Sequence, residues 1–376
     1  MRIGIPRETR PDETRVAATP DVVRKYVERG AEVVVESGAG GRATFDDASY
    51  RAAGAEVAGG DAAWSADVVL KVQPPTPEEA ARLVQGATLV SFLYPESNPE
   101  TFAALERGRV TALAMESVPR IARAQKMDAL SSMANLAGYK AVLEAANAFG
   151  RFFPLLMTAA GTIPPAHVLV IGAGVAGLSA IVTARRLGAV VRAFDPRPAV
   201  KEQVQSLGAR FLDLDLESAE TADGYAAAQS EEFLRLERDL LAAQMNEVDV
   251  VITTALIRGQ PAPVLITDEM LQAMKPGSVV VDLAVEQGGN CAGSRPDEVV
   301  SVHGVTVIGW TNMAARVPVS GSTLYARNVQ HLVHHLWNEV GLAFDFDDEI
   351  VDGTAVLRKG RPRQAEAPVE ATGRQA

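Results

Sequence analysis

The chain has 376 residues, which is too long for one ordinary hydrophobic core and predicts two domains. Its 36 Lys and Arg against 47 Asp and Glu give a formal net charge of −11, and this acidic balance speaks against nucleic acid as the main partner. Cys291, the only cysteine, excludes a disulfide within the chain, and the absence of an apolar run of about 18 residues or of a signal-peptide core predicts a soluble cytoplasmic protein.

From residue 1 to about residue 118, short apolar runs alternate with amphipathic segments. The runs are predicted to be strands and the segments helices, each helix opened by a proline suited to its first turn. Strands that alternate with helices predict a parallel sheet covered on both faces. The expected strands are residues 2–5, 32–36, 67–72, 88–92 and 110–114, and the expected helices are residues 20–29, 77–84 and 99–107. A further helical segment, residues 121–149, is expected to link this lobe to a second one.

The second lobe is expected to hold strands at residues 168–171, 190–194, 209–212, 249–253, 278–283 and 306–308. After it, residues 322–344 have helical periodicity, with an apolar stripe formed by Leu324, Val329, Leu332, Val333, Leu336 and Val340. We expect this helix to return and pack on the first lobe. The sequence thus predicts an α/β protein of two Rossmann-like, doubly wound parallel-sheet lobes joined by long helices, residues 1–125 with 320–345 and residues 126–319. The charged residues 346–376 are predicted to be a disordered tail.

A glycine-rich turn follows the first strand of the second lobe. Gly172, Gly174 and Gly177 have the spacing G-x-G-x-x-G, and a helix-like segment and a second apolar run come after them. In this motif the first glycine permits the tight turn, the second lets a pyrophosphate approach the backbone, and the third lets helix and strand pack closely. Close packing or a plain tight turn can also require glycine, but the surrounding order of strand, helix and strand favours dinucleotide binding.

Asp195, at the end of the second apolar run, indicates which dinucleotide is bound. A carboxylate there accepts hydrogen bonds from the ribose hydroxyls and repels a 2′-phosphate, which favours NAD(H) over NADP(H). Arg197, two residues later, tempers this preference, because an arginine there can reach a phosphate.

Two histidines, the cysteine and one polar stretch are the other candidates for chemistry. His331 and His335 are spaced i, i+4 on the C-terminal helix, but no Glu-rich helix or Cys cluster accompanies them, so no metal site is expected. Cys291 is expected to be a small packing residue rather than a nucleophile. The polar stretch 213–232 is either a solvated loop or a mobile lid over a site.

The segment between the lobes, residues 120–139, is dense in amides, hydroxyls and charges. Its polar side chains include Arg120, Gln125, Asp128, Ser131 and Ser132. By default these are capping and solvated residues. In a two-lobe dinucleotide protein, however, the nicotinamide ring projects into the interlobe cleft. There Gln and Ser side chains can hydrogen-bond the carboxamide, and an Arg–Asp pair can hold them in place.

Five blocks of the sequence point to one family: RAQKMDALSSMANLAGYKAV, GAGVAGLSAI, AFDPRPAVKEQVQSLGA, ITTALIRG and VVVDLAVEQGGNC. Together they resemble the NAD(H)-binding component of the proton-translocating nicotinamide nucleotide transhydrogenases, within the wider alanine dehydrogenase superfamily. The resemblance covers about residues 1–340. It implies a homodimer that works with an NADP(H)-binding subunit and a membrane-spanning subunit, and that is peripherally associated with the inner membrane through them.

The resemblance also implies site residues. The nicotinamide-side, catalytic residues fall on Arg120, Gln125, Asp128 and Ser131. Together with the glycine turn, the expected cofactor-binding set is Gln125, Lys126, Met127, Asp128, Gly172, Gly174, Val175, Ala176, Gly177, Asp195, Pro196, Arg197, Gly224, Tyr225, Ala255 and Leu256, in which Tyr225 is the tyrosine of a mobile loop.

Three positions separate the two branches of the superfamily. Arg15 and Lys71 match substrate-binding positions of alanine dehydrogenases, but the position of their catalytic histidine is Tyr94, and no histidine precedes His167. Without that histidine, the acid–base step on an imine or hydroxy acid lacks its usual agent. Hydride exchange between two nicotinamides needs only two rings held at contact distance with water excluded. We therefore expect a subunit that passes hydride from NADH to NADP⁺ on a partner, coupled to proton movement. The alternatives are an alanine-type dehydrogenase and a non-catalytic NAD(H)-sensing module.

Overall fold

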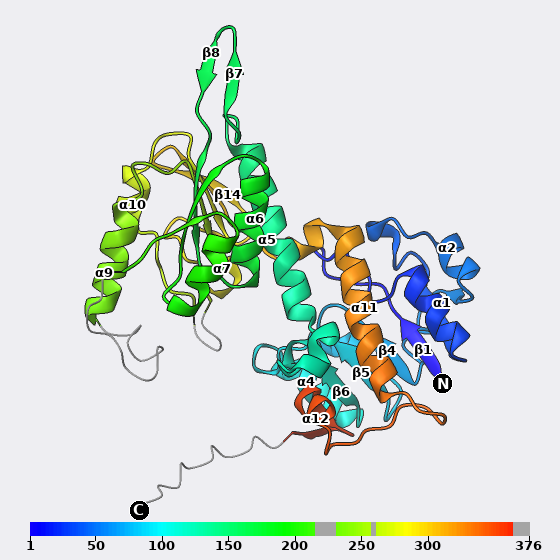
Figure 1. Cartoon of the computed structure of the whole chain (residues 1–376). Coiled ribbons are helices and arrows are strands. Elements are labelled where there is room, and N and C mark those ends of the chain that lie inside the picture. The colour runs from blue at the N-terminus through cyan, green and yellow to red at the C-terminus, as the bar shows by residue number, and fades with distance from the viewer. Residues whose placement is uncertain (215–230, 257–260, 364–376) are drawn as a thin grey trace, which may run out of the picture. The chain divides into compact units, whose positions relative to one another are not determined.

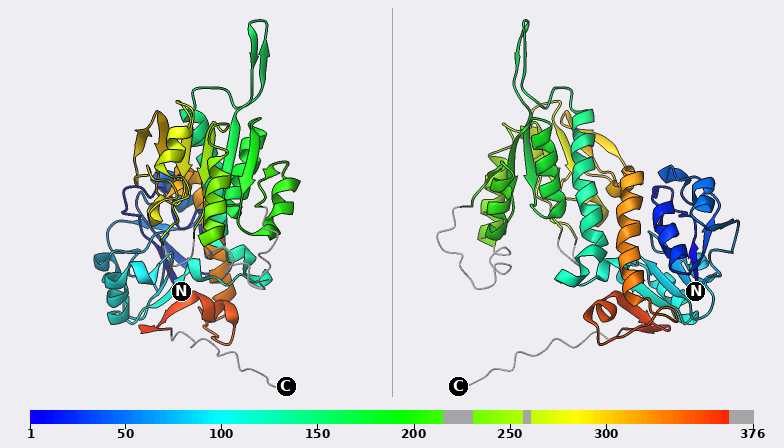
Figure 2. Two further views of the ribbon diagram at one scale, coloured as in Figure 1. Left: turned by 90° about the vertical axis from the view of Figure 1, so that its left-hand side faces the viewer. Right: turned by 45° about the vertical axis from the view of Figure 1, so that its right-hand side comes forward.

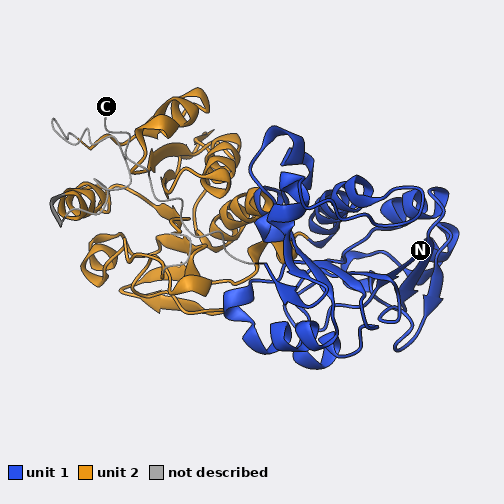
Figure 3. Ribbon diagram, turned by 90° about the horizontal axis from the view of Figure 1, so that it is seen from below, with its two compact units in different colours: residues 1–132, 318–376 blue, residues 133–317 orange. Residues whose placement is uncertain are grey.

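The computed structural model describes residues 1–214, 231–256 and 261–363. The chain divides into two compact units, unit 1 with residues 1–132 and 318–376, and unit 2 with residues 133–317 (Figure 3). Unit 1 is therefore built from both ends of the chain, and unit 2 is inserted between them. The sequence predicts divisions at residues 125/126 and 319/320, whereas the first division falls inside the helix α5 (Ala129–Ala148).

Unit 1 is organised around an eight-stranded sheet with the order β17-β16-β6-β5-β4-β1-β2-β3 (Figure 1). The strands from the N-terminal region of the chain are β1 (Arg2–Ile5), β2 (Glu32–Glu36), β3 (Glu56–Ala58), β4 (Val68–Leu70), β5 (Thr88–Ser91) and β6 (Thr111–Ala114). These six are parallel, and β4, β5 and β6 are buried along their whole length, as expected of strands covered on both faces. All five strands predicted for this lobe are present, and β3 is additional.

Each described α-helix of unit 1 begins either with a proline or after an aspartate whose side chain caps it. These helices are α1 (Pro20–Glu28), α2 (Asp47–Ala52), α3 (Pro77–Ala80), α4 (Pro99–Arg107), α11 (Pro318–Leu336) and α12 (Glu349–Thr354). Thr76 and Glu79 form a reciprocal capping box on α3, which is shorter than the predicted helix 77–84. In α2, the Asp46 side chain accepts from the N–H of Ser49 at 2.8 Å.

Helix α11 returns to unit 1, as predicted (Figure 2). The Tyr325 hydroxyl donates to the Lys71 carbonyl at 2.7 Å, and the Val16 N–H donates to the Ser322 hydroxyl at 3.1 Å. Of the predicted apolar stripe, Val329, Leu332, Val333 and Leu336 are buried, whereas Val340 lies beyond the end of the helix and is 96% exposed.

The prediction of a disordered tail from residue 346 is wrong for residues 349–362. After α12, the chain forms β16 (Ala355–Arg358) and β17 (Arg361–Pro362), and β16 pairs antiparallel with β6. The alternating sequence of β16 buries Ala355 and Leu357 completely, which explains why this charged segment is ordered. Residues 364–376 lie outside the described residues.

Unit 2 has a seven-stranded sheet with the order β11-β10-β9-β12-β13-β15-β14. The strands are β9 (His167–Ile171), β10 (Val190–Phe194), β11 (Arg210–Phe211), β12 (Val250–Thr253), β13 (Val279–Asp282), β14 (Val299–Val302) and β15 (Val305–Ile308). All are parallel except the edge strand β14, which pairs antiparallel with β15 and was not predicted. Besides most of α5, the described α-helices of this unit are α6 (Val175–Arg186), α7 (Lys201–Ser206), α9 (Glu231–Ala242) and α10 (Asp268–Ala273). The predicted fold class, with two Rossmann-like α/β units, is confirmed.

The period-two alternation of β9 separates two hydrophobic cores in unit 2. Val168 and Val170 face a core that includes residues of α5, α6 and α7. Leu169 and Ile171 face a second core that includes residues of α9 and α10. Because both faces of the sheet are covered, the carboxyl ends of its strands are its accessible edge for a ligand.

A hairpin of unit 2 was also not predicted. Strands β7 (Leu156–Thr158) and β8 (Gly161–Ile163) form a separate two-stranded ribbon that projects from the rest of unit 2 (Figures 1 and 2). Met157 is 71% exposed and Leu155 is 55% exposed. Large apolar side chains are thus displayed on a ribbon with no sheet to cover them.

Candidate functional site

The glycine turn joins the end of β9 to the start of α6 with the predicted geometry. Gly172 has φ +94°, a conformation that L side chains rarely adopt. A Cβ on Gly177 would lie 1.8 Å from the carbonyl oxygen of Gly172, so only glycine lets α6 start this close to β9. A Cβ on Gly174 would meet no described atom within 4 Å. One glycine is therefore required for packing, and another leaves open space above the turn.

The N-terminus of α6 offers an anion site beside this space. Gly174 is the N-cap, and no acidic side chain lies in the first turn. The Leu178 N–H donates to the Gly174 carbonyl at 2.8 Å, which leaves the preceding N–H groups of the helix without an intrahelical partner. Free N–H groups at the positive end of a helix attract phosphate groups. The open side of Gly174 leaves them within reach of a ligand.

Asp195 follows β10 and lies against the turn. It is 5% exposed, and its Oδ2 accepts from the Ala173 N–H at 2.7 Å. The Arg197 backbone N–H and Nε both donate to Oδ1 at 2.9 Å, and Nη2 donates to Oδ2 at 2.9 Å. Burial by itself would raise the pKa of Asp195, but the hydrogen bonds from Arg197 and Ala173 outweigh it and hold that pKa below its ordinary value. Asp195 is thus an ionised, buried hydrogen-bond acceptor at the turn.

The segment after β12 completes this edge of the sheet. The Thr254 hydroxyl donates to the Gly172 carbonyl at 3.0 Å and so ties the segment to the glycine turn. Leu256 is 49% exposed and Val175 is 41% exposed. The carboxyl ends of β9 and β12 therefore carry exposed apolar side chains next to the polar turn, a mixture that suits a ring with a polar attachment.

This segment is held in place by a buried side-chain amide, which sequence reasoning missed. Asn290 is fully buried, and its side-chain amide donates to the carbonyls of Ala255 and Pro263 at 2.9 and 2.8 Å. Its Oδ1 accepts from the Ala255 N–H at 3.0 Å. Asp282, also fully buried, in turn accepts from the Asn290 N–H at 2.8 Å. A polar residue after a glycine pair, in GGN, was the only available sign of this role.

The four residues predicted to lie on the nicotinamide side, Arg120, Gln125, Asp128 and Ser131, belong to unit 1. The segment around them forms the 3-10 helix η4 (Ala122–Met127) and the start of α5. Asp128 accepts from the Ser131 N–H at 2.8 Å and from its hydroxyl at 2.6 Å, so these two residues cap α5. Arg120 and Gln125 are exposed, and neither side chain is hydrogen-bonded within the described ranges of the chain. The anticipated Arg–Asp pair between Arg120 and Asp128 is not formed there.

The remaining predicted cofactor residues fall into three groups. Lys126 is exposed, whereas the side chain of Met127 is buried. Ala176 lies in the first turn of α6, and Pro196 is exposed next to Asp195. Gly224 and Tyr225 lie outside the described residues, as does most of the polar stretch 213–232.

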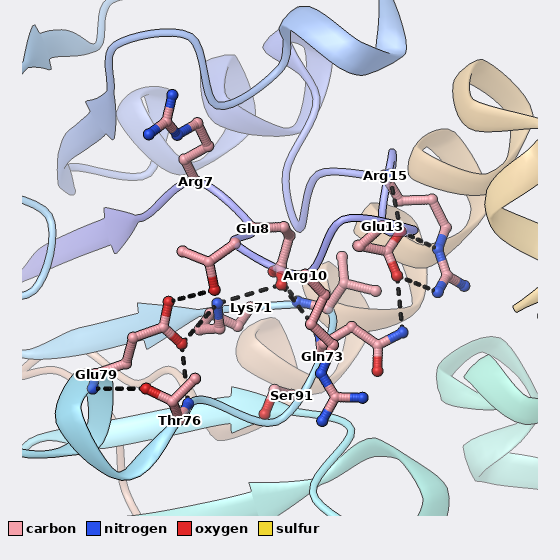
Figure 4. Close-up of polar contacts among 12 residues, drawn as sticks. Arg7, Glu8, Arg10, Glu13, Arg15, Lys71, Gln73, Thr76, Glu79 and Ser91 are labelled. Atoms are coloured by element: carbon pink, nitrogen blue, oxygen red, sulfur yellow. Dashed lines mark hydrogen bonds and ion pairs between the residues drawn. The ribbon is translucent and has the colours of Figure 1, made fainter.

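Lys71, one of the two cations that the sequence predicts to match substrate-binding positions of alanine dehydrogenases, is enclosed by carboxylates of its own chain (Figure 4). Its Nζ lies 3.2 Å from Glu8 and 3.4 Å from Glu79, and all three side chains are buried. Burial raises the pKa of Glu8 above its ordinary value, although the nearby Lys71 lowers it. The lysine is therefore held within a buried ionic network.

Arg15, the second of these cations, is held in the same way. Its Nε and Nη2 donate to the two carboxylate oxygens of Glu13 at 2.7 and 2.6 Å, and the Glu13 Oε2 also accepts from the Gln73 amide at 2.7 Å (Figure 4). Arg15 is 3% exposed and Glu13 is fully buried. A bidentate pair of this kind occupies the face with which arginine binds a substrate carboxylate.

Tyr94, which the sequence predicts to replace a histidine of the alanine dehydrogenases, has φ +45° and is 42% exposed. Its ring stacks on Phe92 with centroids 5.9 Å apart, and its backbone N–H donates to Glu116 at 2.6 Å. A positive φ is costly for a tyrosine and marks a strained position at the end of β5.

Metal and thiol chemistry find no support in the described residues. Within them, no group of three or more His, Cys, Asp or Glu side chains is placed to hold a metal ion. His335 pairs with Asp348 at 2.6 Å instead of acting with His331. Cys291 is 3% exposed, and burial raises the pKa of its thiol to about 11, so the thiol stays protonated. No helix in the described ranges is both long enough and apolar enough to cross a membrane.

The glycine turn, the helix N-terminus and the carboxylate after the next strand, in a chain of two parallel-sheet units, define a Rossmann-like α/β protein of the dinucleotide-binding type. The chain belongs to the alanine dehydrogenase/PNT family: the model of the N-terminal domain matches residues 4–137, and that of the C-terminal domain matches residues 141–365.

The sequence and the fold of the chain are similar to those of transhydrogenases. It is 50% identical over 364 residues to NAD(P) transhydrogenase subunit alpha of Haemophilus influenzae, covering 96% of this chain and 71% of that one. It is 50% identical over 372 residues to the first of the polypeptides that make up NAD(P) transhydrogenase subunit alpha in Rhodospirillum rubrum, covering 96% and 97%. The crystal structure of transhydrogenase from Sinorhizobium meliloti superposes with a TM-score of 0.88 at 46% identity, covering 96% and 100%. The chain is thus a homologue of transhydrogenase alpha subunits, as its sequence blocks predict.

Proposed function

We propose that this chain is the NAD(H)-binding subunit of a proton-translocating transhydrogenase. It passes hydride from NADH to NADP⁺ that is bound on a partner subunit, and a membrane-spanning subunit couples this step to proton movement. The observation that carries the proposal is the glycine turn at the start of α6 with the buried, ionised Asp195 beside it. The 50% identity to transhydrogenase alpha subunits supports the choice of reaction.

The residues around the turn fit the adenosine and pyrophosphate moieties of NADH. The space above Gly174 has no described atom within 4 Å of a Cβ there, so a pyrophosphate has room to approach the free N–H groups of α6. Asp195 accepts hydrogen bonds from the ribose hydroxyls. The exposed side chains of Val175 and Leu256 offer apolar contacts for the adenine ring, and the Asn290 amide holds the backbone of Ala255 in place for them.

The nicotinamide side of the site is proposed at the start of α5. When bound, NADH supplies the hydride. The exposed Gln125 amide and Arg120 guanidinium orient the carboxamide, because neither side chain is committed to another described residue. Asp128 and Ser131 fix the first turn of α5 through their mutual hydrogen bonds and thereby fix the position of Gln125. No residue has to move a proton, which agrees with the absence of a histidine at Tyr94.

We propose further that the protein is a homodimer and is associated with the inner membrane, on its cytoplasmic side, through its partner subunits. The projecting hairpin β7–β8 supports the dimer. A two-stranded ribbon is only marginally stable in water by itself, and exposed apolar side chains on such a ribbon favour burial against a second copy.

Two assays test the function. In a fluorescence titration we expect NADH to bind at least about tenfold more tightly than NADPH, because Asp195 repels a 2′-phosphate. We then expect NADH oxidation only when the NADP(H)-binding and membrane subunits are added with NADP⁺. Comparable affinities for NADH and NADPH would contradict the cofactor assignment, and NADP⁺-independent turnover would contradict the reaction.

The second candidate is an alanine-type dehydrogenase, which Arg15 and Lys71 favour. Both cations are ion-paired with carboxylates of their own chain, which opposes it. Adding pyruvate and ammonium to the isolated chain with NADH separates the two functions. Turnover would support the dehydrogenase, and tight NADH binding without turnover supports the transhydrogenase subunit.

A further inference from the structure

The carboxylate of Asp195 has no acceptor position left for a ribose. A carboxylate offers about four lone-pair positions on its two oxygens. On Oδ2 they are taken by the Ala173 N–H and by Nη2 of Arg197, and on Oδ1 by the backbone N–H and by Nε of Arg197. A ribose that donates two hydroxyl hydrogen bonds to Asp195 therefore has to replace two of these four donors.

The four donors differ in how easily they can leave. The N–H groups of Ala173 and Arg197 are backbone groups fixed by the glycine turn and by the end of β10. The other two belong to the Arg197 guanidinium, whose side chain is 53% exposed while that of Asp195 is 3% exposed. An exposed guanidinium returns to water at little cost, whereas a buried carboxylate that loses donors is strongly destabilised unless new ones arrive. The guanidinium is thus the group that a ribose can displace.

We propose that the Arg197 side chain is an internal stand-in for the ribose, which fills the ribose subsite of Asp195 until the nucleotide replaces it. The guanidinium presents two parallel N–H donors to the two carboxylate oxygens, as the vicinal 2′- and 3′-hydroxyls of a ribose do. It keeps the buried carboxylate satisfied in the absence of ligand. This inference rests on the proposed function, since it assumes that a dinucleotide binds at the turn.

The same exchange makes Arg197 a determinant of selectivity between the two nucleotides. NADH gains the Asp195 hydrogen bonds only by breaking the two from Arg197, so the arginine weakens NADH binding. A 2′-phosphate repels Asp195 but attracts the displaced guanidinium, so the arginine strengthens NADPH binding. Removing the guanidinium should shift the two affinities in opposite directions.

The test is a fluorescence titration of wild type, Arg197→Gln and Lys201→Gln with NADH and with NADPH. Lys201 is the matched control, because it carries the same charge nearby but pairs with Asp213 at 2.7 Å and does not contact Asp195. For Arg197→Gln we expect the NADH Kd to fall by about three- to fivefold, the value of one net hydrogen bond, and the ratio of the NADPH Kd to the NADH Kd to rise by about tenfold or more. Lys201→Gln should leave this ratio within about twofold of wild type.

Two results would contradict the proposal that the Arg197 side chain occupies the ribose position of Asp195. A rise of the NADH Kd in Arg197→Gln, at an unchanged melting temperature, would make Arg197 a direct ligand of NADH. If the ratio of the NADPH Kd to the NADH Kd changes equally in both variants, the change is caused by the loss of a positive charge and not by the contact between Arg197 and Asp195. In either case, tight NADH binding by wild type would still support the proposed function. If neither wild type nor the two variants bind NADH, the proposed function itself is contradicted.

Discussion

Glu237 is a buried carboxyl group without a hydrogen bond or ion pair to any described residue. It lies on α9 one turn before the fully buried Leu241, so it belongs to the face of the helix that packs on the sheet. Burial raises its pKa to about 7, with Arg238 lowering it and the Asp195 carboxylate raising it. The group is therefore half protonated near neutral pH.

The raised pKa predicts a pH-dependent stability. The folded protein holds this proton up to about pH 7, whereas the unfolded chain releases it near its ordinary pKa of 4.5. Stability from Glu237 is present below pH 4.5 and is lost as the pH rises towards 7. We expect Glu237→Gln to remove this loss, so that urea denaturation finds the variant within about 1 kcal/mol of wild type at pH 5 and more stable by about 3 kcal/mol at pH 8.

Glu247→Gln is the matched control. Glu247 is exposed, and the hydrogen bond from Arg192 lowers its pKa, so its replacement should not stabilise the protein at pH 8. A difference between Glu237→Gln and wild type that stays constant from pH 5 to pH 8 would mean that Glu237 is ionised throughout this range.

The sequence singles out Asp195 but not three other buried polar residues, Asn290, Asp282 and Glu237. Asp195 stands at a fixed place in a local motif, because the turn and the following strand set its position. Asn290, Asp282 and Glu237 owe their roles to burial, and burial depends on which distant segments pack against them. Nothing in the neighbouring residues of Glu237, in the charged segment LRLERD, indicates that one of its acids faces the core.

In the glycine turn, close packing of helix α6 and access for a ligand are two separate requirements. A Cβ on Gly177 meets the Gly172 carbonyl directly after β9, and a Cβ on Gly174 meets open space. Helix packing and ligand access therefore depend on different glycines.

Alanine substitutions should show this difference. We expect Gly177→Ala to destabilise the protein by about 2–3 kcal/mol, because the backbone has to move, and to weaken NADH binding as a consequence. We expect Gly174→Ala, which places alanine at the N-cap, to cost only about 1 kcal/mol of stability and yet to raise the NADH Kd more than about tenfold, because its methyl group fills the pyrophosphate position. Thermal unfolding and fluorescence titration measure the two effects. If Gly174→Ala binds NADH as tightly as wild type does, the pyrophosphate does not bind at the turn.

Elements with a strong local pattern are the ones that the sequence predicts. The continuous apolar runs of β5, β9 and β12 were found within one residue of their ends. Strand β14 and the hairpin β7–β8 were missed because they are short, exposed in places and near glycine or proline, so their pattern does not differ from that of a loop. Strand β16 has only two buried side chains, and its charged surroundings concealed them.

In the proposed homodimer, the exposed hairpin β7–β8 is buried against the second copy of the chain. Met157 and Ile163 are 71% and 38% exposed and lie on the two strands of the ribbon. If the ribbon is buried against a second copy, charges at these positions have to be buried with it, at a cost of several kcal/mol.

We expect the double variant Met157→Asp, Ile163→Asp to be a folded monomer at concentrations where wild type is a dimer. Sedimentation velocity measures the association state, and circular dichroism confirms folding. Val299→Asp is the control, because Val299 is 49% exposed on the edge strand β14, away from the hairpin in the sequence. A dimeric double variant would place the interface elsewhere, and a monomeric wild type would contradict the homodimer.

The division of unit 1 between the two ends of the chain has a consequence for its synthesis. Strand β16 joins the first sheet by pairing Ala355 with Leu113, so residues 1–358 have to be synthesised before this strand can dock. Every strand of unit 2 lies within residues 133–317 and emerges earlier. Because nascent domains generally fold as units once they are complete, the unit that comes second in the sequence should reach its native state first. The N-terminal strands remain in an incomplete sheet until residues 355–358 have been translated.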